Sequence, residues 1–293
     1  MIADTSLPLV SWIATPRRWL TTDRSAAFAV ALLFAIAIPC LLAPVFAPYD
    51  PSAQPDIIGL RSVAPSLMHP FGTDQASRDI LSRVIYGGRL SLTVAIVATL
   101  VSVTLGTTYG ALAGFLDGIG GTLLQRILDA LLSIPRLLLL IAIFAAWNDA
   151  PLPVFILALG LTGWYGLARL VRGQVLALKA QDFVQSARAL GATRSRILIR
   201  HILPNVVSQI VVAAMLGIGH VIVLEAGLSY LGIGVHPPDA SWGNIIQEGS
   251  DQIAANWWIS FFPGIAIVLT VMAFNVIGDA LLRALQPRKS VIG

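Results

Sequence analysis

The sequence predicts an all-α membrane protein with six transmembrane helices and both termini in the cytosol. Hydrophobic residues make up 56% of the 293 residues and charged residues only 12%, and the mean hydropathy is +0.81. A soluble domain carries about a quarter charged residues. Six apolar segments are long enough to cross a bilayer, and most basic residues lie beside one set of their ends. These observations predict a single helical membrane domain.

Span length sets the predicted boundaries, because a spanning helix needs about 20 predominantly apolar residues. The first expected span follows a cytosolic segment, 1–25, and is too long for the core of a cleavable signal peptide, so we expect it to be retained. An external segment, 49–89, separates it from a five-helix core, 90–285. Residues 286–293 form a cytosolic tail. The six expected spans are 26–48, 90–113, 123–146, 152–172, 205–231 and 257–281.

The basic residues predict which side each loop faces, because cytosolic loops are enriched in Lys and Arg. Of the 19 basic residues, fifteen fall in regions placed at the cytosol, Arg126 and Arg136 among them. Since an even number of spans returns the chain to its starting side, both termini are predicted to be cytosolic. The net charge of +4 therefore indicates topology in a lipid bilayer and no nucleic-acid partner. The external regions hold only Arg61, Arg78, Arg83 and Arg89.

The sequence contains no motif for catalysis, nucleotide binding or metal binding. It has no Gly-x-x-x-x-Gly-Lys-Ser/Thr loop, no His-Glu-x-x-His pair and no Gly-x-Ser-x-Gly elbow. The four histidines are scattered, and the single cysteine, Cys40, lies inside the first span. We therefore expect no catalytic residue, no metal site and no cofactor bound by this chain.

Ionisable residues inside spans are costly and need partners. Asp129 follows Arg126 by three residues and Asp279 precedes Arg283 by four, so each pair is predicted to form an ion pair on one helix face. Glu225 has no basic partner at helical spacing in its span. We expect it either to line a watery path through the bundle or to make a structural hydrogen bond to a neighbouring helix, and the spacing leaves both open.

The loop 182–204, between the fourth and fifth spans, is the most informative segment. Asp182 can cap a short helix, Gly191 can turn the chain at positive φ, and a second basic helix can run to Pro204, which starts the next span. Two helical halves joined by a glycine elbow suit a docking element that passes force to or from a cytosolic partner. The alternative is an amphipathic helix pair lying on anionic headgroups.

This loop also resembles a known element. Gln185-Ser186-Ala187, then Gly191, then Ile202-Leu203-Pro204 resembles the EAA loop of ABC importer permeases. Within that class, the external segment His69-Pro70-Phe71-Gly72-Thr73-Asp74, followed by Arg78-Asp79, resembles the dipeptide/oligopeptide/nickel permease family. Segments starting at Glu225, Ser241 and Gly278 are similar to that family too. The similar segments follow one another in matching order from about residue 69 to 288, and they indicate its C-type permease.

The resemblance implies a MetI-like transmembrane domain and a division of labour among subunits. A second homologous permease would share the translocation path, which Glu225 is expected to line. Two ABC ATPase subunits, which carry the ATP and Mg²⁺, would dock on the coupling loop 174–204. An extracytoplasmic solute-binding protein would deliver the substrate. The residues expected to couple to the ATPases are Asp182, Gln185, Ser186, Ala187, Gly191, Ile202, Leu203 and Pro204.

By this resemblance the chain would be a multi-pass, non-enzymatic subunit of the bacterial inner membrane that imports di- or oligopeptides. A nickel or metal-chelate importer is the alternative, and a channel or an intramembrane enzyme are further ones. The sequence departs from the family at Gln185, where the family carries a glutamate. Because glutamine still offers hydrogen bonds, we expect docking to survive this change.

Overall fold

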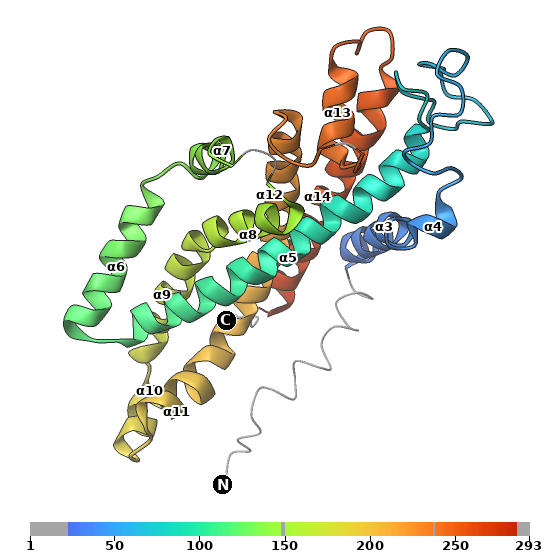
Figure 1. Cartoon of the computed structure of the whole chain (residues 1–293). Coiled ribbons are helices and arrows are strands. Elements are labelled where there is room, and N and C mark those ends of the chain that lie inside the picture. Colours follow the sequence, from blue (N-terminus) through green and yellow to red (C-terminus); the bar gives the residue numbers. More distant parts are fainter. Residues whose placement is uncertain (1–22, 148–149, 237, 286–293) are drawn as a thin grey trace.

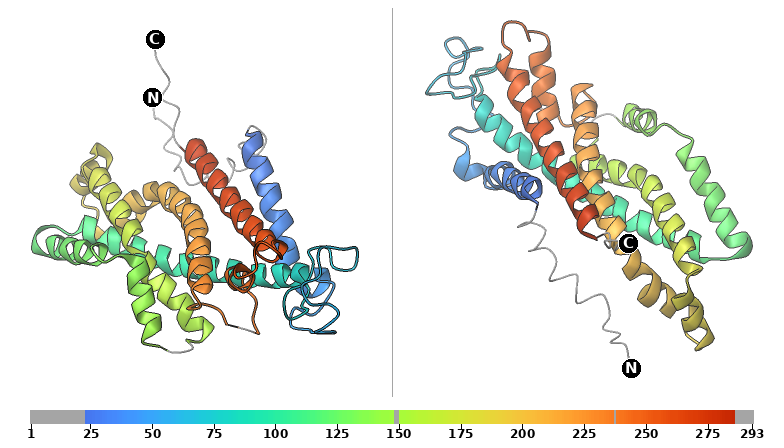
Figure 2. Two further views of the ribbon diagram at one scale, coloured as in Figure 1. Left: turned by 90° about the horizontal axis from the view of Figure 1, so that it is seen from above. Right: turned by 180° about the vertical axis from the view of Figure 1, so that it is seen from behind.

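The computed structural model describes residues 23–147, 150–236 and 238–285, and the regular secondary structure of this part is helical, with loops between the helices and one isolated bridge between Thr73 and Asp79. The helices pack around α5, Ile80–Phe115, which crosses the middle of the molecule (Figure 1). Segment 49–79 and α13, Trp242–Ser250, lie towards one end of the molecule, and α10, Asp182–Ala189, lies at the other (Figures 1 and 2). Most of the predicted N-terminal segment 1–25 and the tail 286–293 fall outside the described residues.

Five helical stretches are long and apolar enough to cross a membrane, and a bent helix pair makes a sixth if it counts as one crossing. The all-helical, multi-span fold predicted from the sequence is thereby confirmed. Large apolar side chains such as Phe28, Leu100 and Val268 are exposed on these helices, as expected where lipid surrounds a protein. The five stretches are Arg24–Leu41, Ile80–Phe115, Leu152–Lys179, Arg194–Tyr230 and Trp258–Ala284.

Helix α3, Arg24–Leu41, begins where the Asp23 carboxylate accepts hydrogen bonds from the backbone N–H groups of Ser25 and Ala26. A further short helix, α4, Ala43–Phe46, follows it. Buried Ala29 packs against Ala273 and Ile277 of α14, Trp258–Leu285, so the first described helix is attached to the last.

Helix α5 begins ten residues before the predicted span 90–113, so the last part of the segment 49–89, which was predicted to be external, is helical. Asp79 caps the helix, because its Oδ2 accepts from the backbone N–H of Ser82 at 2.7 Å. Arg83 and Arg89 were counted among the external basic residues. In the structure Arg83 lies in the first turn of α5, where it is buried among acidic partners.

The predicted third span, 123–146, is a broken helix. Its two parts, α6, Gly118–Leu132, and α7, Arg136–Ala145, meet at an angle of 73°. Pro135 stands at the N-terminus of α7, where its fixed φ suits the first turn of a new helix. The break therefore turns α7 away from the axis of α6.

The fourth span joins two helices, α8, Leu152–Gly163, and α9, Tyr165–Lys179, and is longer than the predicted 152–172. It packs closely along α5, since a Cβ at Gly110 would collide with the backbone oxygen of Ala168. Small residues allow such approach in membranes, where helix association depends on packing. The fifth span is α12, Leu203–Tyr230, and the sixth is α14.

Candidate functional site

The loop predicted to dock a partner is built as two short helices with an elbow. Gly191 follows α10 with φ of +81°, and α11, Arg194–Arg196, begins after Thr193, whose hydroxyl accepts from the backbone N–H of Arg196. The predicted elbow at Gly191 is therefore present. Asp182 is the first residue of α10 and does not cap it; the cap position belongs to Gln181, which makes no side-chain cap bond.

One face of this loop is anchored in the protein. Val184 of α10 and Ile202 are fully buried, and they pack in one cluster with Val171 and Val175 of α9 and with Val206 of α12. This cluster ties the loop to two spans at once. A displacement of α10 would therefore push directly on α9 and α12.

The loop also carries exposed apolar side chains that were not predicted from the sequence to be part of the site. Phe183, Leu190 and Ile199 are 43%, 89% and 65% exposed. Among the predicted residues of this loop, Gln185 and Ser186 are exposed. The available signal was the amphipathic pattern of α10, in which Val184 is buried while Phe183, Gln185 and Ser186 are exposed.

The second half of the loop continues into α12 without interruption. A π-helical turn, Ile197–Ile202, connects α11 to Leu203, and Pro204 lies in the first turn of α12. Proline has no backbone N–H and disrupts the α-helical hydrogen-bond ladder of the preceding turn, and single π turns commonly accommodate such breaks. The helical run Arg194–Tyr230 is thereby continuous from the loop into the fifth span.

Polar contacts tie the loop to the neighbouring helix ends. The Gln185 amide donates to the backbone oxygen of Lys179 at 3.1 Å. The Lys179 ammonium donates to the backbone oxygen of Phe115 at 2.8 Å and to Asp117 at 2.5 Å. This hydrogen bond from Lys179 holds the pKa of the Asp117 carboxyl below its usual value. The turn between α5 and α6 is thus linked to the base of the loop.

At the opposite end of the molecule, the motif starting at His69 folds onto the bundle. His69 Nδ1 lies 2.9 Å from Asp79 Oδ1, so the histidine rests against the carboxylate that caps α5. Phe71 stacks on Phe262 of α14 with ring centroids 3.8 Å apart. Gly72 has φ of +76°, and a Cβ there would lie 2.8 Å from the Trp258 ring. The motif therefore packs segment 49–79 against α14.

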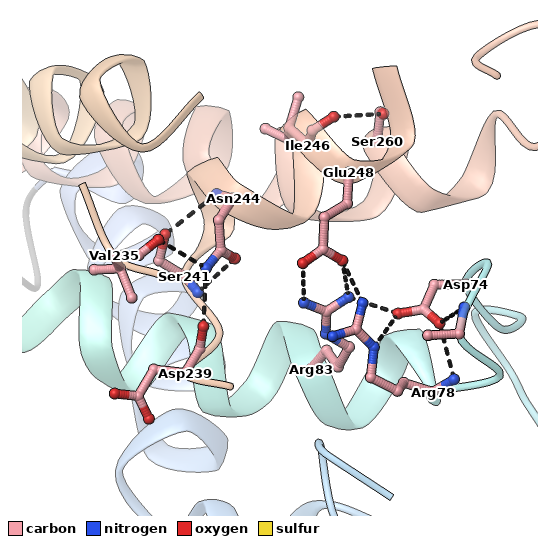
Figure 3. Close-up of polar contacts among 11 residues, drawn as sticks. Asp74, Arg78, Arg83, Val235, Asp239, Ser241, Asn244, Ile246, Glu248 and Ser260 are labelled. Carbon is pink, nitrogen blue, oxygen red and sulfur yellow. Dashed lines mark hydrogen bonds and ion pairs between the residues drawn. The ribbon is translucent and has the colours of Figure 1, made fainter. Parts of the chain in front are cut away.

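The same motif supplies half of a buried ion cluster, shown in Figure 3. Asp74 Oδ2 accepts from Arg78 Nε at 2.7 Å and from Arg83 Nη1 at 2.6 Å. Glu248 of α13 accepts from both arginines, at 2.5 Å from Arg78 Nη2 and from Arg83 Nη1. Glu248 was not predicted to be a site residue. Nothing in the sequence around it indicates that its partners are Arg78 and Arg83, which lie 170 and 165 residues away.

Glu225 is fully buried between α12 and α5. Its two carboxylate oxygens accept from Ser91 at 2.9 Å and from Ser229 at 2.8 Å, and Ser91 Oγ also accepts from the backbone N–H of Trp242. The hydrogen bond from Ser91 of α5 is interhelical, of the kind that the sequence offered as the second alternative, whereas Ser229 lies on the same helix as Glu225. A place on the translocation path stays a prediction for this residue.

Two predicted ion pairs are wrong. Asp129 pairs with Arg169 at 2.9 Å and not with Arg126. Arg283 pairs with Asp23 at 2.8 Å and not with Asp279. A neighbouring helix offered each residue a better partner than its own helix did. Hydrogen bonds from Ser25 and Arg283 lower the pKa of Asp23 to about 2.

Within the described residues, no group of three or more His, Cys, Asp or Glu side chains is placed to hold a metal ion. The architecture is that of a polytopic helical membrane protein, with an elbow loop at one end and an ion-paired motif at the other.

Comparisons with known proteins assign this architecture. The family model described as "Binding-protein-dependent transport system inner membrane component" matches residues 106–291. The chain is 38% identical over 279 residues to the oligopeptide transport system permease protein OppC of Haemophilus influenzae, covering 94% of this chain and 88% of the relative. It is 42% identical over 264 residues to the glutathione transport system permease protein GsiD of Escherichia coli, covering 90% and 86%.

A third relative is the dipeptide transport system permease protein DppC of Bacillus subtilis, 36% identical over 282 residues and covering 96% of this chain and 87% of the relative. Among solved structures, the inward-facing MetNI methionine ABC transporter has a chain of the same fold. Its TM-score is 0.59 at 19% identity, covering 71% of this chain and 98% of that one.

The fold and its elbow loop define a membrane transport permease. The chain belongs to the family of binding-protein-dependent transport system inner membrane components. It is a permease subunit of an ABC importer, with a MetI-like domain, and a multi-pass protein of the inner membrane. The family works, in general, with ATPase and binding-protein partners.

Proposed function

We propose that this permease imports peptides together with a second, homologous permease, two ABC ATPase subunits and an extracytoplasmic solute-binding protein. The names of its relatives, which are permeases of oligopeptide, dipeptide and glutathione transport systems, support a peptide substrate. In this proposal the ATPase subunits bind ATP and Mg²⁺ and carry out hydrolysis. This chain supplies part of the translocation path and the surface on which an ATPase docks.

One observation carries the docking part of the proposal: the loop 182–204 has one anchored face and one exposed apolar face. Val184 is fully buried, whereas its neighbour Phe183 is exposed together with Leu190 and Ile199. Burying exposed apolar side chains of this size stabilises a complex by about 1–3 kcal/mol each. These three residues would therefore be the hydrophobic contacts of the ATPase groove, with Gln185 and Ser186 as polar contacts beside them.

The same geometry supports transmission of force. When the ATPases close on ATP, a movement of α10 would reach α9 through Val184 and α12 through the π-helical turn. Because Arg194–Tyr230 forms one continuous helical run, it would tilt as a unit. Gly191, which has nothing within 4 Å of a built Cβ, would keep the angle between α10 and α11.

Co-purification of the assembled subunits tests the docking surface. Leu190→Asp and Ile199→Asp should each reduce recovery of the ATPase subunits with this chain by about tenfold or more, since a carboxylate cannot enter an apolar groove without a large desolvation cost. Ile58→Asp is the matched control, because Ile58 is an exposed apolar residue of the segment 49–79, which lies at the opposite end from α10. Unchanged ATPase recovery with both loop variants would refute the proposed docking face.

Uptake by proteoliposomes tests the substrate. The complete assembly, with ATP inside and the binding protein outside, should accumulate labelled di- or oligopeptides. Accumulation of a nickel chelate and of no peptide would instead establish the alternative function.

A further inference from the structure

An arginine in the interior of the bundle is not used by the docking loop or by the ion cluster. Arg136 is the first residue of α7, directly after the break at Pro135. From the sequence, Arg136 was expected to lie at the cytosolic face with most other basic residues. In the structure its guanidinium lies against α8. Its Nη2 donates to the backbone oxygen of Leu159 at 2.7 Å and its Nε to Thr162 Oγ1 at 3.3 Å.

These contacts lie well inside a span. Leu159 and Thr162 belong to the apolar run Leu152–Lys179, roughly 10–15 Å along the helix from its start. The hydrocarbon core of a bilayer is about 30 Å thick, so the Arg136 charge lies at a depth where water is scarce. Ionisable residues at such depth usually face the bundle interior or a water-filled cavity, and they mark substrate pathways.

The surroundings of Arg136 leave room for its head and provide only neutral partners. A Cβ built on Gly163 would lie 2.9 Å from Arg136 Nη2 and 2.5 Å from Ser102 Oγ, so the guanidinium occupies the space that a side chain at 163 would fill. Side chains from α5, α7 and α8 thus converge on one polar spot.

Among the residues that the structure describes, no carboxylate forms an ion pair with Arg136. Its two hydrogen bonds go to a carbonyl and a hydroxyl, which do not neutralise its charge, and neither uses Nη1. Arg136 is also only partly buried. The Arg136 guanidinium is therefore a positive charge that has no anionic partner among the described residues.

We propose that Arg136 binds the carboxylate of a substrate during passage through the permease. A guanidinium matches a carboxylate in geometry, because two parallel N–H groups can donate to its two oxygens. A peptide carries a carboxylate at its C-terminus, so this inference rests on the proposed import of peptides. Leu159 and Thr162 hold the guanidinium in place until the substrate carboxylate takes over part of its hydrogen bonding.

Uptake of one peptide in two forms tests this inference. A labelled tripeptide with a free C-terminal carboxylate and the same peptide with a C-terminal amide are compared in proteoliposomes, with the same binding protein throughout. Each variant is judged by its acid-to-amide uptake ratio relative to the wild-type ratio, which cancels the preference of the binding protein. Arg136→Gln should lower this ratio by about tenfold or more, the size of one charge-assisted hydrogen bond.

Arg136→Lys keeps the charge but not the two-pronged geometry, and it should retain part of the ratio. Arg126→Gln is the control, because Arg126 is an exposed arginine on the other half of the broken span. If Arg136→Gln fails to assemble, Arg136→Cys in a Cys40→Ala background replaces it. Modification with an ammonium-bearing methanethiosulfonate should then raise acid-peptide uptake, and a sulfonate-bearing reagent should not.

The possible outcomes separate the two proposals. Wild-type uptake of peptide with an unchanged acid-to-amide ratio in Arg136→Gln, or equal effects of the two thiol reagents, would overturn the role of Arg136 alone. Wild-type uptake of neither peptide form would overturn the proposed substrate and, with it, this inference.

Discussion

The guanidinium of Arg83 donates two hydrogen bonds to the carboxylate of Glu248, although the two residues are 165 positions apart in the sequence. Nη1 donates to Oε2 at 2.5 Å and Nη2 donates to Oε1 at 3.0 Å. Arg83 stands in the first turn of α5 and Glu248 on α13 (Figure 3). Arg78 and Asp74 complete the cluster, so segment 49–79, α5 and α13 are held together at one end of the molecule.

Glu248→Ala should lower the free energy of unfolding by about 3 kcal/mol, because it leaves the buried Arg83 with Asp74 as its single acidic partner. Melting of the detergent-solubilised protein measures the effect, and the exposed Asp251→Ala is the control. In an Arg83→Met background the same substitution should cost less, since no buried guanidinium is left unpaired. Equal costs in both backgrounds would show that the pair contributes nothing to stability.

Gly191→Val should leave the protein inserted and folded but weaken ATPase docking and abolish uptake. The open space around Gly191 means that the effect is conformational: a β-branched residue is strained at φ of +81°, by about 1–2 kcal/mol or more. Gly191→Asn should retain docking, because asparagine tolerates this conformation. Gly173→Ala, at an open position inside α9, serves as the control. Normal substrate-stimulated ATP hydrolysis and transport by Gly191→Val would contradict the role of the elbow.

Gln185→Glu should leave assembly with the ATPases intact. A carboxylate cannot donate to the backbone oxygen of Lys179, but that hydrogen bond is exposed and is worth only about 1 kcal/mol. Co-purification of the ATPase subunits measures the outcome. Loss of the complex would show that Gln185 and the ATPase surface are adapted to each other.

Glu225→Ala should destabilise the packing of α5 against α12, because the hydroxyls of Ser91 and Ser229 lose their acceptor inside the protein. A loss of about 1–3 kcal/mol is expected for such unsatisfied groups. Glu225→Cys in a Cys40→Ala background separates the two roles weighed for this residue. If Glu225 lines the path as predicted, this cysteine should react with a water-soluble thiol reagent, whereas protection in every nucleotide state would favour the packing role.

The comparison of sequence with structure shows where local patterns succeed. Gly191 and Pro204 were identified as elbow and helix start because single residue types restrict the backbone directly. The ion pairs were predicted from spacing within one helix, and both failed, since Asp129 and Arg283 found partners on other elements. The start of α5 was predicted ten residues too late for a related reason. The charge of Arg83 indicates a solvent-exposed segment, and only the structure shows that Asp74 and Glu248 neutralise this charge.

Hydrophobicity and the spacing of glycine, proline and basic residues determined the helical membrane fold, its approximate spans and the elbow of the loop 182–204. These features depend on the solvent around each segment and on the backbone preferences of single residues. Short stretches of sequence are enough to encode both properties. Tertiary structure alone decided that Glu248 closes the ion cluster, that Glu225 meets Ser91, and that Arg136 enters the bundle beside Gly163. Each of these depends on which distant helix supplies a partner at hydrogen-bond distance, and spacing along the chain carries no such information.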